Sequence, residues 1–141
     1  MDIWQQIAPE FSKTENWGVP GRVSGFLLLA LSQLRRDLGL QVVIHNAFET
    51  DGHSEGSQHY NGGAVDFHLV TDLPFYRQIL LVENFLERFQ LASHCGFGIY
   101  PSWNSPGFHL DARGVKARWG FDKQGRSVAY NVAKDIARGM M

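Results

Sequence analysis

The chain has 141 residues, of which 44% are hydrophobic and 19% charged, and its formal net charge at pH 7 is -1. This length suits one globular domain over residues 1–141 and is too short for two independent cores. The balanced charge argues against a nucleic-acid partner, because phosphate binding requires clustered lysine and arginine. Cys95 is the only cysteine, which excludes an intrachain disulfide and a zinc site made of several thiolates.

The sequence also argues against contact with a membrane. Its richest apolar run, residues 26–31, is far shorter than the roughly 18 residues that can span a bilayer. The first twenty residues lack the basic start and the apolar stretch of a secretory signal. We therefore expect a cytoplasmic monomer.

Hydrophobic periodicity predicts a first helix over residues 22–38, followed directly by a buried strand over residues 40–44. Residues 46–63 are small, polar and rich in glycine, which is typical of a loop. Beyond this loop we predict a strand over residues 64–69 and a second helix over about residues 73–90.

The C-terminal part of the chain is predicted to consist of short strands and a final helix. Residues 96–100 and 107–113 are predicted strands joined by a turn, residues 117–130 a hairpin, and the remaining residues a helical stretch. Together these elements predict an α+β fold, in which a small antiparallel sheet carries a zinc site and two main helices flank the sheet.

Two of the predicted strands have one apolar and one polar face. Because side chains alternate along a strand, Asp66 and His109 each lie on a polar face, and His59 lies in the loop before the first of these strands. Catalytic zinc usually has three histidine or carboxylate ligands and leaves a fourth position for water. We therefore predict a zinc ion held by His59, Asp66 and His109. The alternative is an ordinary structural role for each, as a surface histidine or a hydrogen-bonded buried acid.

These residues belong to two motifs. Residues 57–66, SQHYNGGAVD, match the form Ser-x-His-x-x-Gly-x-Ala-x-Asp, and residues 107–114, GFHLDARG, contain a later His-x-Asp block. The two motifs in this order resemble those of the M15 zinc metallopeptidases, the D-alanyl-D-alanine carboxypeptidase family, which includes phage endolysins. The resemblance covers residues 22–120. It implies an α+β fold, a zinc ion and cleavage of peptide bonds in the peptidoglycan peptides of bacterial cell walls.

The resemblance also assigns roles to individual residues. The three predicted ligands fall at the ligand positions of the family, and Ser57 falls where it would orient the loop and contact substrate. Asp111 shares a strand face with His109, so it is the candidate general base. Its alternative role is to hydrogen-bond a ligating imidazole.

The chain departs from the family pattern at two places. Pro106 stands where many members carry the catalytic acid, so Glu49 and Glu55 are alternative bases. Glu49 also lies near the place where many members carry an arginine that binds the terminal carboxylate of the peptide, and it would repel that group. Arg113 is the candidate substitute for substrate binding, with a surface ion pair as its other interpretation. We therefore expect either an endopeptidase or a carboxypeptidase.

Five further residues are candidates for the surroundings of the site. Tyr100 and Trp103 are expected to line the cleft, and His45 and His53 to lie near enough to contact substrate. His68 is either a hydrogen-bond partner of the site or a polar residue at a strand end.

Two other functions remain open. Two histidines and one carboxylate also bind iron in non-haem oxygenases, although these enzymes need a double-stranded β fold with more strands than we predict. The domain is alternatively a binding module that keeps zinc for structure and recognises wall peptides without cutting them. The absence of a signal also suits a phage-encoded protein that another factor releases to the cell wall.

Overall fold

The computed structural model describes residues 2–53 and 55–140. Its helical elements are α1 (Ile3–Gln6), η1 (Pro20–Arg22), α2 (Gly25–Leu38), η2 (Gln58–Asn61), α3 (Phe75–Arg88) and α4 (Tyr130–Arg138). Its strands are β1 (Gln41–Asn46), β2 (Ala64–Val70), β3 (Gly96–Tyr100), β4 (Gly107–Asp111), β5 (Ala117–Phe121) and β6 (Ser127–Val128). Within the described residues, no helix is long and apolar enough to cross a membrane.

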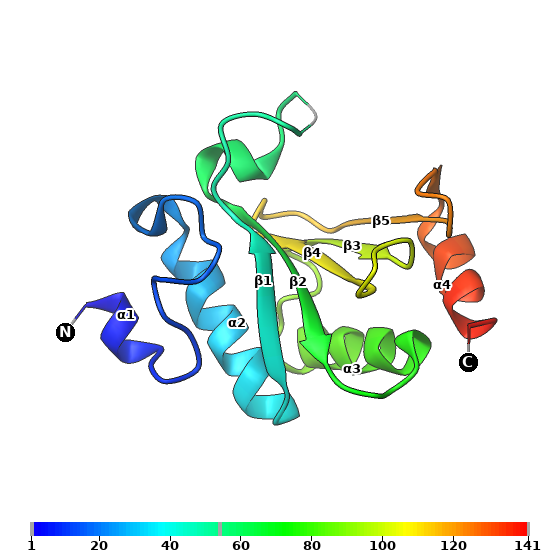
Figure 1. The fold of residues 1–141 in the computed structure, drawn as a ribbon, viewed down its shortest axis with the longest axis horizontal. Coiled ribbons are helices and arrows are strands. Elements are labelled where there is room, and N and C mark those ends of the chain that lie inside the picture. Colours follow the sequence, from blue (N-terminus) through cyan, green and yellow to red (C-terminus); the bar gives the residue numbers. More distant parts are fainter. Residues whose placement is uncertain (1, 54, 141) are drawn as a thin grey trace.

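The six strands form one sheet in the order β1-β2-β4-β3-β5-β6. All neighbouring strands are antiparallel except β3 and β5, which are parallel. This exception arises from the order of the strands, in which β3 lies between β4 and β5. Strand β5 follows β4 in the chain and runs antiparallel to it, so β5 is parallel to β3 (Figure 1). The predicted α+β fold with a mostly antiparallel sheet is confirmed.

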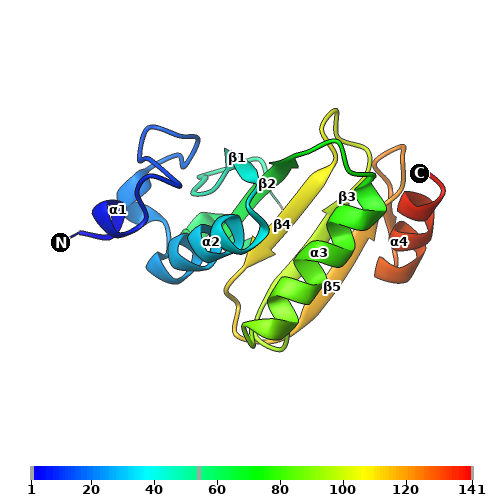
Figure 2. The same ribbon diagram turned by 90° about the horizontal axis from the view of Figure 1, so that it is seen from below.

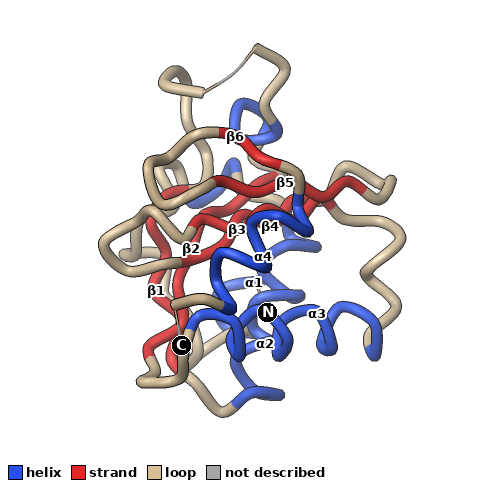
Figure 3. Tube along the Cα trace, turned by 90° about the vertical axis from the view of Figure 1, so that its right-hand side faces the viewer, coloured by secondary structure: helices blue, strands red, loops and turns tan. Residues whose placement is uncertain are grey.

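The helices cover one face of the sheet and leave the other face to the site. Figures 2 and 3 show α2, α3 and α4 on the same side of the strands, while the loop that carries η2 rises at one end of β1 and β2 (Figure 1). The buried apolar side chains of the strands point toward these helices, and they include Val65, Phe67, Phe97, Phe108 and Leu110. Alternation along each strand therefore places polar residues and glycines on the face away from the helices.

Several element boundaries differ from the sequence prediction. Helix α2 begins at Gly25, after the separate short turn η1, and α3 begins at Phe75, after Pro74 in the N-cap position. Strand β4 ends at Asp111, two residues before the predicted end, so Arg113 lies beyond the strand. Helix α1 was not predicted, because four residues are too few to show a helical period.

Candidate metal centre

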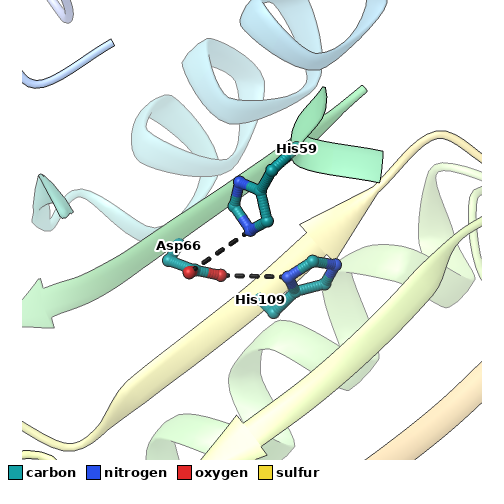
Figure 4. Close-up of side chains that lie close together, drawn as sticks. All are labelled: His59, Asp66 and His109. Carbon is teal, nitrogen blue, oxygen red and sulfur yellow. Dashed lines mark hydrogen bonds and ion pairs between the residues drawn. The ribbon is translucent and has the colours of Figure 1, made fainter. Parts of the chain in front are cut away.

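The three predicted ligands lie together on the face of the sheet away from the helices (Figure 4). Asp66 on β2 is directly opposite His109 on β4, and the Nδ1 atom of His109 is 2.9 Å from one Asp66 oxygen. His59 extends from η2, and its Nε2 atom is 3.3 Å from the other Asp66 oxygen. All three side chains are buried, and one ligand atom from each lies within 4.8 Å of the others.

The hydrogen bonds around His59 fix which of its nitrogens can bind a metal. Its Nδ1 atom is 2.7 Å from the carbonyl oxygen of Ala47. A carbonyl only accepts hydrogen bonds, so Nδ1 carries the proton and Nε2 of the neutral ring presents a lone pair. This lone pair faces an oxygen of Asp66. Two acceptors in contact repel each other unless a proton or a metal ion lies between them.

His109 faces Asp66 with the other ring nitrogen. Its Nε2 atom is 2.8 Å from an oxygen of Asp111, while Nδ1 faces Asp66. With a metal ion at Nδ1, Nε2 would carry the ring proton and donate it to Asp111. Histidines that bind metals typically donate their other ring proton to a carbonyl or a carboxylate. Both histidines therefore have the partners that a metal centre requires, and the donor set suits a metal ion.

Burial and hydrogen bonding act in opposite directions on the ionisation of these groups. Burial raises the pKa of Asp66, but its interactions with His109 and His59 outweigh this effect and hold the pKa below its usual range. Burial lowers the pKa of His109, but its hydrogen bonds to Asp111 and Asp66 outweigh this effect and raise the pKa. In the absence of metal, the carboxylates on the two sides of the His109 ring thus favour its protonated form.

Both carboxylate oxygens of Asp111, the candidate base, already accept hydrogen bonds from groups of the protein. One oxygen accepts from the backbone N–H of Gly96 at 3.1 Å and from Nε of Arg113 at 2.9 Å. The other accepts from Nε2 of His109 at 2.8 Å and from Nη2 of Arg113 at 2.7 Å. The side chain is fully buried, and burial opposes its ionisation, but the bonds from Arg113 and His109 keep its pKa low.

Arg113 thus pairs with Asp111 through two of its nitrogens, and its guanidinium lies 5.0 Å from the ring centre of Trp119. The strand ends at Asp111, and the chain after it turns so that this side chain folds back onto the carboxylate. The positive charge of Arg113 is therefore already balanced within the protein.

The loop before β2 holds His59 through its own backbone contacts. The Ser57 hydroxyl caps η2 by accepting from the backbone N–H of His59 at 3.2 Å. Gly62 follows η2 with φ +76°, and a Cβ atom there would lie 1.7 Å from the carbonyl oxygen of Arg22. Glycine is thus required at this turn, which brings the loop back to β2.

The metal centre lies in a pocket of about 470 Å³. The pocket is lined by the three predicted ligands, by Ser57, Tyr100, Arg113, Trp119, Phe121 and Ser127, and by the loop residues His53, Glu55, Gly56 and Gln58. Of the two alternative bases, Glu55 belongs to this lining and Glu49 does not. Another pocket, of about 690 Å³, lies between α3 and α4. It contains the Glu83–Lys134 ion pair and none of the predicted ligands.

The structure adds residues that the sequence did not single out. Trp119 on β5 lies in the same row across the sheet as Asp66, His109 and Gly98. Its ring centre is 4.9 Å from that of His109, and a Cβ atom on Gly98 would lie 2.4 Å from its Nε1 atom. The alternating glycines of β3 were a usable signal, because a glycine inside a strand often marks a close approach of another group.

Of the other histidine candidates, His53 lines the pocket, whereas His45 and His68 lie outside its lining. The His53 ring stacks on His59 with ring centres 4.0 Å apart. Nε2 of His45 is 2.6 Å from Nδ1 of His68, beside the centre, and the His45 ring stacks on Trp103. Burial lowers the pKa of all three histidines. Trp103 is outside the pocket lining, whereas Tyr100 is within it.

Comparisons of this chain with protein-family models, with curated proteins and with solved structures found no match. The site is therefore interpreted from its residues and their geometry.

Proposed function

We propose that the protein is a zinc-dependent hydrolase that cleaves peptide bonds. The observation that carries the proposal is the pair of histidines around one buried carboxylate: the Ala47 carbonyl fixes the His59 tautomer that presents Nε2 to Asp66, His109 directs Nδ1 to the same carboxylate, and the group lies at a pocket large enough for a peptide segment. Zinc accepts this combination of two imidazoles and one carboxylate, and three protein ligands are typical of its catalytic sites.

The residues of the site divide into those that hold the metal and those that support them. His59, Asp66 and His109 would be the ligands. A zinc ion bound there would lower the pKa of water and polarise a carbonyl group. Asp111 would hold the His109 ring in the tautomer that binds zinc, because all of its contacts are to donors within the protein.

This arrangement favours the supporting role of Asp111 over the role of general base. A base must reach the water that it deprotonates, whereas Asp111 is fully buried and its oxygens already accept from Arg113, His109 and Gly96. We propose Glu55 as the base, because it is the carboxylate in the pocket lining that is neither a ligand nor paired with an arginine.

The substrate class rests on the resemblance of the two motifs to wall peptidases. Within that class, the pairing of Arg113 with Asp111 favours cleavage inside a chain over removal of a terminal residue. A carboxypeptidase needs a cation for the terminal carboxylate, and here the arginine of the pocket is already neutralised. We therefore propose an endopeptidase acting on cross-linked or otherwise extended peptidoglycan peptides.

The two rival functions have less support. The six-stranded sheet with helices on one face differs from the double-stranded β fold expected of an iron oxygenase. A zinc ion kept only for structure would usually have its ligand set closed by a fourth protein residue. Among the described residues, the candidate ligand group has three members.

The proposal is tested by metal analysis together with digestion of purified peptidoglycan. We expect one zinc per chain in the wild type, loss of zinc in His59→Ala, and retention in His94→Ala, which removes an exposed histidine away from the site. Mass spectrometry of the digest should show new peptide termini with the wild type alone. Iron with oxygen-dependent turnover, or zinc without any cleavage of wall peptides, would refute the proposed reaction.

A further inference from the structure

Tyr100 ends β3 on the site face, and its ring is fixed by two neighbours. The Trp103 ring stacks on one side with centres 4.4 Å apart, and the Phe121 ring stacks on the other with centres 4.7 Å apart. Because both faces of the phenol ring are packed, the side chain cannot rotate to another position, and the fold therefore fixes the position of its hydroxyl group. Tyr100 belongs to the lining of the pocket that contains the three predicted ligands.

The hydrogen bond that Tyr100 makes determines the direction of its own proton. The indole Nε1–H of Trp119 donates to the Tyr100 oxygen at 3.0 Å. Indole nitrogen has no acceptor lone pair, so Tyr100 cannot donate in return. Among the described residues, this oxygen has no other hydrogen-bond partner. The O–H group therefore remains available as a donor to a molecule in the pocket.

The donor is held close to the metal centre through Trp119. The indole lies flat over Gly98, where any side chain would collide with it, and its ring packs beside that of His109. One aromatic side chain thus contacts both a predicted ligand and the Tyr100 hydroxyl. In addition, burial raises the pKa of Tyr100 to about 12, so the group keeps its proton at physiological pH.

We propose that Tyr100 is a further catalytic residue, which donates a hydrogen bond to the substrate oxygen that becomes negatively charged during hydrolysis; this rests on the proposed function. When water adds to the scissile carbonyl carbon, a C–O bond forms and the carbonyl π pair moves to the oxygen. The oxygen pair then re-forms the C=O bond as the C–N bond breaks, and the amine leaves with the C–N pair and a proton from the attacking water. Tyr100 stabilises the charge and keeps its own proton throughout.

The test is Tyr100→Phe, which removes the hydroxyl and keeps the stacked ring. Tyr76→Phe is the matched control, because it removes a hydroxyl that bonds to Arg138 on the helical side, away from the pocket. Two readouts are needed: turnover of cross-linked muropeptides, and the affinity of the zinc-loaded protein for acetohydroxamate, measured by calorimetry. The second readout does not depend on turnover, since this probe places an oxygen anion beside the metal.

We expect Tyr100→Phe to keep its zinc content, to lose some thermal stability because the Trp119 Nε1–H loses its acceptor, to lose about 10²- to 10³-fold in turnover, and to bind acetohydroxamate about tenfold more weakly. Tyr76→Phe should match the wild type in both readouts. Unchanged turnover and unchanged probe affinity in Tyr100→Phe would overturn the donor role while leaving the hydrolase intact. A wild type that cleaves nothing but binds the probe in a Tyr100-dependent way would overturn the proposed reaction and keep the donor.

Discussion

Replacing Asp111 with asparagine separates its two possible roles. The substitution keeps the size of the side chain but puts an amide N–H where an oxygen now accepts from donors. In one orientation, the amide N–H faces the donors of Arg113 and Gly96. In the other orientation, it faces the donors of Arg113 and His109. The variant also leaves the Arg113 guanidinium without its carboxylate.

The structure allows both consequences to be estimated. Breaking a buried ion pair costs about 3–5 kcal/mol, and the lower end applies because 32% of the Arg113 side chain is exposed. We therefore expect the free energy of unfolding of Asp111→Asn to fall by about 3 kcal/mol. Removing a partner that orients a metal-binding histidine costs about 10- to 100-fold in metal affinity. Zinc affinity should fall by that factor, and turnover should recover when zinc is saturating.

The measurements are denaturant unfolding, zinc affinity by competition with a chelator, and turnover as a function of free zinc. Asp37→Asn is the matched control, because it removes a carboxylate that pairs with Arg88 on the helical side. It should lower stability slightly and leave zinc affinity unchanged. A general base would behave differently: Asp111→Asn would then keep wild-type zinc affinity and lose about 10²- to 10⁴-fold in turnover at every zinc concentration. That result would refute the supporting role.

Three further predictions follow from the same contacts. In the metal-free protein, the hydrogen bonds of His109 to carboxylates outweigh burial and raise its pKa. The contribution of protonated His109 to the free energy of unfolding is therefore complete below about pH 6.5 and is lost as pH rises through the pKa of the folded state. The stability difference between wild type and His109→Gln should thus shrink from pH 6 to pH 9 in denaturant titrations with chelator; a growing difference would contradict it. Arg113→Ala should slow cleavage of a free pentapeptide and of its amide by equal factors, whereas a larger effect on the free acid would show that Arg113 binds the terminus. Gly98→Ala should displace Trp119, so turnover should fall with zinc retained; wild-type turnover would mean that the indole does not position Tyr100.

The shared face of Asp66 and His109 was predictable because it depends on a short-range rule. Side chains alternate along strands, so Asp66 and His109 had to share faces with polar neighbours, and pairing of β2 with β4 then placed them opposite each other. The strand pairing itself was not predicted from the sequence. The α+β class was likewise predictable from the alternation of helical and strand periods, since each period was sustained over a whole element.

The role of Asp111 was harder to predict, because it depends on where a strand ends. A strand that continued to residue 113 would place Arg113 beside the ligands with its charge available. The strand ends at Asp111 instead, and Arg113 folds back to pair with that carboxylate. The residue at which a strand ends is difficult to predict from sequence. Here a difference of two residues decides whether the charge of Arg113 is available or is paired with Asp111.

Contacts across several strands were also outside the reach of sequence patterns. The contact of Trp119 with His109 requires that β5 lie beside β3 in parallel, although β4 precedes it in the chain. The pairing of His45 with His68 depends on the register shift between Ile44 and Asn46, which no periodicity shows.

The three candidate ligands are not held equally firmly by the surrounding structure. This difference predicts which of them a bound metal ion would lose first. Asp66 and His109 lie on neighbouring central strands, and His109 is contacted from three sides by Asp66, Asp111 and Trp119. His59 is the ligand outside the sheet, and it is held by the Ala47 carbonyl and by the turn that Ser57 caps. Because loops open locally at lower free energy than central strands, the metal should first lose its bond to His59. We therefore expect local opening of the loop around His59, and not of the sheet, to limit the rate at which a bound metal ion would be released.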